Sequence, residues 1–515
     1  MDYLNNLLTP TLKNDIETII HEISTFQYQI LFGICALFVA YLIGNLIKRI
    51  RSNFPPGPIG IPIFGYMPFL SEDLHLDLIK LGEKYGDVFS VRLGSQTIVI
   101  LHGADIIKEA FAKPEFLGRP PNADLEFVNP FSSFFAGDVH AWKEQRRFVV
   151  HSMKDLGLGR TKIEDDIMDE VHHFLEVLRN QNGTPVDVKG PLSPSMSNNI
   201  CALIFGKRYE YEDRDRKMLD KNLEQAIEFF TQNSLYTLFP WILSIPFSMK
   251  FLKINKSVEA VNNMRKFFVT EINKHIKSLD PRNIRDFIDT YLLEMKSQEK
   301  QNPNTTFSNE RLISNVLDIF AAGSETVRTS ILWFVYSMAA FPEVQKKVQQ
   351  EILEVLGTER NPEFLDMKCM PYTHAVILEL MRWKTIVPLN IMHYTLADTK
   401  VGGYDIPKGT IVIANFWQAH NDLRYWDEPE KFKPERFLGK DGKTIVKSKY
   451  FMPFSVGKRA CPGESMAYLE MFLYFTSMLQ KFDIVFPPGV KPTFEAKLAI
   501  NYRLEPYKVR FIPKC

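Results

Sequence analysis

The sequence predicts one large, mainly α-helical domain with a minor β region, preceded by a single transmembrane helix. Three observations predict this fold class. Apolar residues recur with helical spacing over several long stretches, two short runs alternate between apolar and polar residues, and residues 26–47 carry no charged side chain. The hydrophobic fraction of 45% and the charged fraction of 24% are those of a globular protein with a sizeable core.

The uncharged stretch at 26–47 is long enough to cross a bilayer, because a helix needs about 20 apolar residues to do so. A cleaved signal peptide is the alternative, but the stretch is long for that role and no obvious small-x-small cleavage site follows it. We therefore expect residues 1–25 to form a short lumenal N-terminus, residues 26–47 a transmembrane anchor, and residues 48–58 a basic and proline-rich hinge.

Charges on either side of this stretch predict its orientation. Lys48, Arg49 and Arg51 follow it directly, whereas the preceding segment is mostly acidic. Positive flanks favour the cytosolic side, which places the rest of the chain in the cytosol. The five cysteines are sparse and show no paired spacing, which argues against a disulfide framework and against structural zinc, and agrees with a reducing compartment.

Residues 59–515 are expected to form one domain, because no linker, repeat or low-complexity tract divides them. Two alternating runs, 88–93 and 97–101, predict a hairpin that turns at Gly94 and Ser95. Further strands are expected near 391–397 and 410–415. Helical periodicity predicts helices at about 163–180, 214–233, 256–279, 309–341, 343–356 and 371–383.

The net charge gives no indication of a nucleic-acid partner. Lys plus Arg number 62 and Asp plus Glu number 61, so the two signs nearly cancel. The 40 Phe residues suit a roomy apolar interior or an oily substrate site. Among the cysteines, only Cys461 lies in a recognisable sequence pattern. Cys35, Cys201 and Cys515 lie in apolar segments or at the chain end.

Residues 454–463 surround Cys461 with fixed neighbours: Phe454, Gly457, Arg459 and Gly463. The glycines permit tight turns close to a flat ligand, and a helix predicted from about residue 465 favours the thiolate form that binds metal. Arg459 offers a planar fork suited to a carboxylate. The alternative is a structural cysteine in a glycine-rich turn, which the number of matched residues disfavours.

This segment resembles the haem-binding signature of the cytochrome P450 family, Phe-x-x-Gly-x-Arg-x-Cys-x-Gly, and matches each fixed position. The resemblance implies the cytochrome P450 fold over residues 59–515, a haem b cofactor whose iron is ligated by Cys461, and a monooxygenase reaction. It is strongest to the microsomal animal enzymes that metabolise drugs and arthropod hormones. The implied location is the endoplasmic reticulum membrane, with one span and a cytosolic catalytic domain.

Further motifs occur in the order that the family predicts. Ala322 and Gly323 lie inside the helix predicted at 309–341, followed by Glu325 and Thr326. An isolated motif of this kind would indicate close helix packing. In the family these positions make room for dioxygen and relay protons to it, which implies catalytic roles for Glu325 and Thr326. Val327 departs from the Thr or Ser that often follows.

Propionate contacts are implied for Trp142 and Arg146, which match the family's Trp-x-x-x-Arg, and for His393. Trp142 can donate its indole N–H, and Arg146 can donate from its guanidinium group. A surface or structurally satisfied histidine is the alternative for His393. A structural network behind the haem is implied for three further residues, Glu379, Arg382 and Arg436.

The resemblance also implies partners. The chain has no flavin fingerprint, so we expect electrons from NADPH through a separate cytochrome P450 reductase, with cytochrome b5 as a second expected donor. Four lysines near the cysteine loop could receive an acidic partner or form an ordinary solvated face: Lys143, Lys431, Lys433 and Lys458. Aromatic segments at 127–135 and 229–247, with positions 320, 322, 387, 389 and 391, are expected to line a site for a lipophilic substrate.

Two other functions are weighed against a monooxygenase. One is a haem-thiolate isomerase or dehydratase that rearranges a peroxide, and the other is a haem-binding sensor without turnover. The Glu325-Thr326 pair argues against both, because neither needs protons for dioxygen. The sequence leaves the substrate open between xenobiotics and a dedicated steroid or terpenoid.

Overall fold

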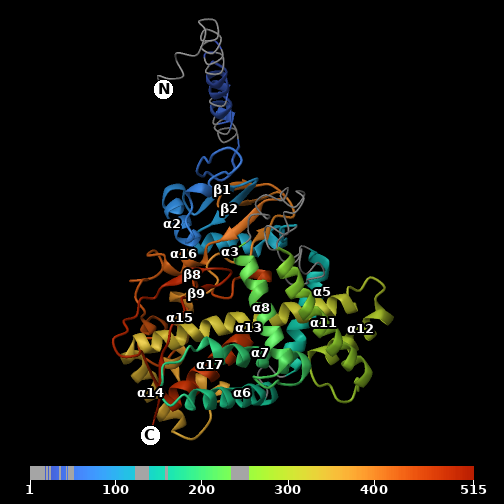
Figure 1. Cartoon of the computed structure of the whole chain (residues 1–515), viewed down its shortest axis with the longest axis vertical. Helices are drawn as coiled ribbons and strands as arrows, with labels where there is room; N and C mark the ends of the chain where they lie inside the picture. Colours follow the sequence, from blue (N-terminus) through green and yellow to red (C-terminus); the bar gives the residue numbers. More distant parts are fainter. Residues whose placement is uncertain are drawn as a thin grey trace, which may run out of the picture.

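A four-stranded sheet lies at the end of the molecule next to the N-terminal helix, and the helices fill the remainder (Figure 1). The computed structural model describes residues 18, 21, 25–33, 36–41, 43–44, 52–121, 138–156, 161–232 and 254–514. Within these residues no helix has both the length and the apolar character needed to span a membrane. Parts of the predicted anchor, and all of residues 45–51, lie outside them.

The predicted hairpin is confirmed. β1 (Val88–Leu93) and β2 (Gln96–Leu101) pair antiparallel, and β2 also pairs in parallel with β6 (Ile411–Ala414). β3 (His393–Tyr394) completes the sheet, antiparallel to β6. Three two-stranded sheets pair β4 (Thr399–Val401) with β5 (Tyr404–Ile406), β7 (Phe482–Val485) with β10 (Arg510–Pro513), and β8 (Ala496–Leu498) with β9 (Tyr502–Leu504).

Six predicted helices agree with the structure to within a few residues: α6 (Thr161–Arg179), α8 (Arg214–Gln232), α11 (Ile254–Ser278), α13 (Asn309–Ala340), α14 (Pro342–Leu356) and α15 (Pro371–Trp383). A seventh, α17 (Glu464–Lys481), begins where the cysteine loop ends. Helices that the periodicity did not identify are α2 (Leu74–Tyr85), α3 (Ala104–Ala112), α5 (Val139–Asp155), α7 (Lys189–Phe205), α12 (Phe287–Gln301) and α16 (Phe416–Asn421).

α13 is the central helix of the fold and crosses the middle of the helical region in Figure 1. Ser308 caps its start by accepting a hydrogen bond from the Arg311 backbone N–H, and it ends at Ala340, just before Pro342 begins α14. It packs against α7, α17 and α11. Most of its residues are buried, so its local shape fixes the positions of the helices around it.

One glycine lets α7 approach α13 closely. A Cβ at Gly323 would lie 2.5 Å from Ile200 Cδ1 of α7, well inside van der Waals contact. The small residues of this segment therefore serve helix packing on one side. Helix packing was the alternative interpretation of this motif, and it holds for Gly323.

Candidate functional site

The cysteine loop is held in a tight turn immediately before α17. A short 3-10 helix covers Gly457–Arg459, and the backbone N–H of Cys461 donates to the carbonyl of Phe454 at 2.8 Å. Gly457 has a positive φ of 75°, and a Cβ there would lie 2.2 Å from the Phe111 carbonyl oxygen of α3. Both the backbone conformation and this close approach require glycine.

The Cys461 thiol keeps an accessible face, while protein packs closely around it. Burial raises the pKa of the thiol above its ordinary value, although the Gly463 backbone and the charge of Arg146 lower it. The helix N-terminus was expected to favour the thiolate, and the Gly463 backbone does lower the pKa, but in the protein alone desolvation outweighs this contribution. A bound metal cation would supply the additional stabilisation of the thiolate.

Cationic side chains gather beside the thiol. Arg459 is buried, and its guanidinium lies 4.1 Å from the centre of the Trp142 ring. Its Nε donates to the Leu117 carbonyl at 3.0 Å, and Arg146 donates to the carbonyl of Ala460. The structure thus brings Trp142, Arg146 and Arg459 together, as the resemblance implied.

Arg119 belongs to the same cluster and was not identified from the sequence. It is buried beside His393, and its Nη1 donates to the Met392 carbonyl at 2.9 Å while its Nε has no partner in the described structure. His393 is also buried, stacks on the Phe111 ring at 3.9 Å, and has no partner for its Nε2 among the described residues. Arg119 stands in no motif, so no sequence signal could distinguish it from other arginines.

The buried cations of this cluster repel one another. Burial and repulsion from Arg119 and Arg146 lower the pKa of Arg459 to about 8, and burial and Arg146 lower that of Arg119 to about 9. Such an arrangement is costly unless an anion lies among the cations. The unpartnered nitrogens of Arg119 and His393 offer donors to it. The residues present therefore fit the propionate carboxylates of a haem placed against the Cys461 thiol.

On α13, Ala322 is exposed and Thr326 is half-buried, so this stretch of an otherwise buried helix keeps an accessible face. The Thr326 hydroxyl donates to the Ala322 carbonyl at 2.8 Å. A hydroxyl held in this way can still accept a hydrogen bond and pass on a proton. Val327, the departure from the family pattern, is buried in the core.

Glu325 is buried and makes contacts separate from those of Thr326. Its carboxylate is bound by Arg328, one turn further along α13, and by Arg503 of β9 at 2.7 Å. The Thr329 hydroxyl donates to the Glu325 carbonyl at 3.0 Å. The two residues predicted to relay protons are thus adjacent in the chain, but the carboxylate is engaged in an ion pair.

The structural network predicted behind the site is present. Arg382 makes a two-pronged contact with Glu379 at 2.7 and 2.8 Å, and Arg436 donates to the same carboxylate at 3.0 Å. Glu379 and Arg382 are completely buried. Their charges are matched and fully hydrogen-bonded, which is the condition under which a buried ion pair is tolerated.

Substrate-contact predictions are only partly covered. The segment 127–135 lies outside the described residues, as do residues 233–247. Val387, Leu389 and Ile391 are half-buried. Phe320 is different, because it is fully buried and packs on Phe268 of α11 at 5.7 Å between ring centres. Phe320 is therefore a core residue and not a wall residue.

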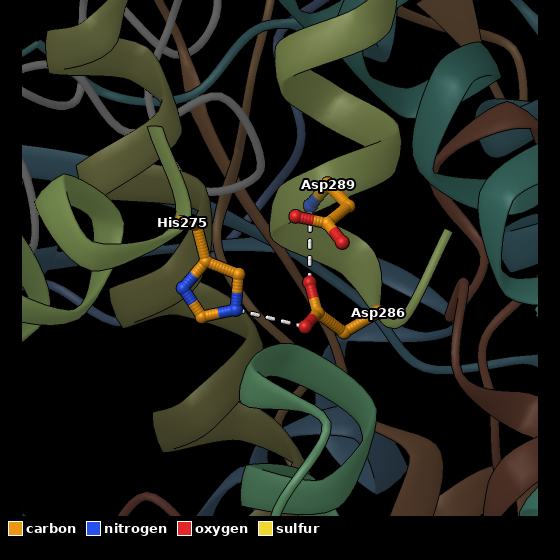
Figure 2. Close-up of side chains that lie close together, drawn as sticks. All are labelled: His275, Asp286 and Asp289. Atoms are coloured by element: carbon orange, nitrogen blue, oxygen red, sulfur yellow. Dashed lines mark hydrogen bonds and ion pairs between the residues drawn. The ribbon is translucent and has the colours of Figure 1, made fainter. Parts of the chain in front are cut away.

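A second cluster of potential metal ligands joins α11 to α12 (Figure 2). His275 Nε2 lies 2.8 Å from Asp286 Oδ2, and the backbone N–H of Asp289 donates to Asp286 Oδ1 at 3.0 Å. Both oxygens of Asp289 are bound by Arg285, at 2.6 and 2.7 Å. Because these donors already serve one another, the cluster acts as an internal ion-pair network that ties two helices together.

Comparison with known proteins decides the family. The family model for cytochrome P450 matches residues 55–511, which is most of the chain. The chain belongs to the cytochrome P450 family. This confirms the fold predicted from the sequence, mainly helical with a small β region, and makes haem the expected cofactor.

Several curated relatives support this assignment. Cytochrome P450 2J2 of Homo sapiens is 38% identical over 475 residues, covering 90% of this chain and 92% of the relative. Cytochrome P450 2B2 of Rattus norvegicus is 37% identical, covering 87% and 92%, and cytochrome P450 18a1 of Drosophila melanogaster is 33% identical, covering 94% and 91%. The predicted enzyme class, a cytochrome P450 monooxygenase, is thereby confirmed.

Proposed function

We propose that this cytochrome P450 carries haem b on Cys461 and inserts one oxygen atom of dioxygen into a lipophilic substrate, by hydroxylation or epoxidation. The observation that supports it best is the accessible Cys461 thiol beside a cluster of buried, mutually repelling cations. The thiol suits the haem iron, and the cluster of cations suits the propionate carboxylates of the same cofactor.

Each predicted site residue has a proposed task. Trp142, Arg146, Arg459 and His393 bind the propionates, and Arg119 joins them. Phe454 packs on the ring of Tyr468 at 5.3 Å and keeps water from the sulfur side, while Gly463 leaves room beside the Cys461 Sγ. Ala322, which is exposed, keeps the α13 surface low where dioxygen would bind, while Gly323 lets α7 pack closely against the same helix.

The bound haem supplies the oxygen-activating chemistry, which consumes two electrons and two protons for each dioxygen. Thr326 would hold and pass a proton at its hydroxyl oxygen, and Glu325 would resupply it from solvent. Val327 contributes no hydroxyl, so any third member of the relay has to be another group.

Electrons are proposed to come from NADPH through cytochrome P450 reductase, with cytochrome b5 as a second donor. Of the four lysines expected to receive such a partner, Lys431 and Lys433 are engaged with local carboxylates. Lys458 lies in the cysteine loop and Lys143 lies on α5, and both side chains are exposed. They are the better candidates for an acidic partner surface.

Residues 26–47 are proposed as the single transmembrane anchor, with residues 1–25 in the lumen, 48–58 as the hinge, and 59–515 in the cytosol at the endoplasmic reticulum. The absence of charge over 26–47 and the basic residues after it support this arrangement. A substrate dissolved in the bilayer would reach an apolar site from there, as expected for a xenobiotic, a steroid or a terpenoid.

The deciding experiment supplies the full-length holoprotein with NADPH, dioxygen and purified reductase, together with a panel of lipophilic compounds. Compounds are first selected by the spectral shift that follows displacement of water from the haem iron. We expect product formation that depends on NADPH, and Cys461→Ser should abolish both product and the thiolate band of the reduced carbon monoxide complex. The matched control Cys369→Ser, at an exposed cysteine, should leave both unchanged.

Three outcomes contradict the proposal. Product that forms from an organic peroxide alone, and never from NADPH with dioxygen, identifies an isomerase or dehydratase. An unchanged thiolate band in Cys461→Ser shows that another residue ligates the iron. Haem binding with no turnover under either condition identifies a sensor.

A further inference from the structure

α5 contacts the cysteine loop on one face and the start of α13 on another. Trp142 and Arg146, about one turn apart on α5, meet the cysteine loop through Arg459 and the Ala460 carbonyl. Because a helix is rigid over one turn, the register of α5 sets the positions of both side chains at once. A group that fixes this register therefore acts on the cationic cluster beside Cys461.

Gln145, on the neighbouring face of α5, joins this helix to α13. Gln145 and its partner Asn315 on α13 are completely buried. Gln145 Oε1 accepts a hydrogen bond from Asn315 Nδ2 at 2.8 Å, and Gln145 Nε2 donates to the Thr306 hydroxyl at 3.0 Å. The same hydroxyl donates to Glu144, whose carboxylate also accepts from the Thr306 backbone N–H at 2.7 Å. Two consecutive side chains of α5 thus bind α13 and the connection that precedes it.

These hydrogen bonds are compatible with one arrangement of donors and acceptors. The Thr306 hydroxyl has a single proton, which it gives to the Glu144 carboxylate, so it can only accept from Gln145. The Gln145 amide oxygen is then left for Asn315, which donates to it. A displacement of α5 by the rise of one residue, about 1.5 Å, would separate both pairs and leave buried amide groups without partners.

The other contacts of α5 with this region specify its register less strictly. Phe148 packs edge-on against two aromatic rings, at 5.2 and 5.3 Å between ring centres, and apolar packing is not directional. Asp138 pairs with Arg311 at 3.0 Å, but its carboxylate is about half exposed, where an ion pair contributes little. The buried amide of Gln145 combines directional bonding with exclusion of water, so it is the contact that defines the register.

We propose that Gln145 is a positioning residue for the haem: it fixes the register of α5 against α13 and so holds Trp142 and Arg146 where the propionates bind. This inference rests on the proposed function, from which it takes haem as the cofactor and these two residues as its ligands. Gln145 stands between them in the sequence but bonds to α13 and the connection before it. It therefore acts on the haem through its neighbours on α5.

The test uses the full-length holoprotein and measures the rate at which haem passes to an excess of haem-free myoglobin, together with the reduction potential of the bound haem. Gln145→Leu keeps a similar volume and removes both hydrogen bonds. We expect it to lose haem roughly tenfold faster than wild type, because α5 is no longer held in register. The potential should also fall, since displaced cations offset less of the propionate charge and so stabilise the reduced haem less.

Gln345→Leu is the matched control, because Gln345 on α14 is also a buried amide with several hydrogen bonds. Its Nε2 donates to the carbonyls of Met338 and Ile484, and its Oε1 accepts from the Ile484 backbone N–H. None of these partners belongs to α5 or to the cysteine loop. This variant should unfold at a lower temperature than wild type, while its haem loss and potential, measured well below that temperature, stay unchanged.

Two further variants show whether Gln145 acts through its neighbours. In a Trp142→Phe background, Gln145→Leu should accelerate haem loss by clearly less than in wild type, because part of its effect passes through the Trp142 indole. Thr306→Val removes one of the two hydrogen bonds and should change haem loss and potential in the same direction, by a smaller amount.

The inference is overturned if Gln145→Leu matches Gln345→Leu in haem loss and potential, or if its full effect persists in the Trp142→Phe background. Should Gln145→Leu retain too little haem to measure, Thr306→Val decides, and wild-type haem loss and potential in that variant overturn the inference. Failure of the proposed function is distinct, since wild type would then form no product from NADPH and dioxygen, whereas these measurements need only bound haem.

Discussion

Gly457 shows how one residue without a side chain maintains the cysteine loop. Its φ is positive, and an added Cβ would lie 2.2 Å from the Phe111 carbonyl oxygen, which leaves no space for alanine. We expect Gly457→Ala to lower the free energy of unfolding by about 2–3 kcal/mol, from backbone strain together with a displaced loop. Because the displaced loop carries Cys461 and Arg459, haem content should fall as well. Chemical denaturation and haem absorbance measure the two effects.

The matched control for that variant is Gly442→Ala. Gly442 also has a positive φ, 67°, but a Cβ there meets nothing within 4 Å. Only the strain of the left-handed conformation remains, so the loss should be about 1 kcal/mol with normal haem content. Equal losses and equal haem content in both variants would show that the contact with Phe111 is not what requires glycine at 457.

Site residues were predictable where a fixed spacing carries the chemistry. Cys461, Arg459, Trp142 and Arg146 stand in such patterns, and the structure brings them together. Arg119 and Arg503 could not be found in this way, because each reaches the site from a distant segment and has no recognisable neighbours. The net direction of the thiol pKa could not be predicted either, since the sequence shows the adjacent helix but not the protein packed around the sulfur.

Between elements, the ion-pair network of Figure 2 joins the end of α11 to the start of α12. Burial lowers the pKa of His275, but hydrogen bonds to Asp286 and to the Glu271 carbonyl raise it more, so the net pKa lies above 6.5. A raised folded-state pKa adds stability that is complete below the unfolded-state pKa, about 6.5, and is lost as pH rises through the folded value. Arg285 and Asp289 supply the other two charges of this network.

We therefore expect His275→Gln to destabilise the protein by about 1–2 kcal/mol at pH 6 and by clearly less at pH 9. Denaturant unfolding at the two pH values measures the difference. His151→Gln is the control, because His151 is exposed and bonds only to the Arg147 carbonyl of its own helix among the described residues. A loss for His275→Gln that is the same at both pH values would show that the charged form of this histidine is not involved.

Helices were predictable where one face is apolar and the other polar, as in α6, α8 and α11. α7 was missed because most of its residues are buried, which removes the amphipathic period, and because Pro194 stands inside it. Its interior also carries Ser195, Asn198 and Asn199, which look like loop residues until their partners on α6 and α17 are known.

At the scale of the whole molecule, the fold keeps several uncharged histidines in its core. Burial lowers the pKa of His75, His102 and His374 to about 4, and that of His420 to about 3. His420 Nε2 accepts a hydrogen bond from the Met452 backbone at 2.9 Å, so its protonation would break a contact just before the cysteine loop. The position of the segment before the cysteine loop therefore depends on His420 being neutral.

Acid should consequently unfold this protein before most carboxylates are protonated. Between about pH 6.5 and 4 the unfolded chain binds protons that the buried histidines do not, so the free energy of unfolding falls with pH, by up to roughly 3 kcal/mol for each such histidine. Denaturant titrations from pH 7.5 to 5 measure this slope. His75→Phe should flatten it, because both ring nitrogens of His75 lack partners among the described residues while its ring contacts Trp417 and Tyr502 at 4.9 and 5.2 Å, contacts that Phe can keep. A slope unchanged in His75→Phe would mean that this histidine is not held neutral in the native core.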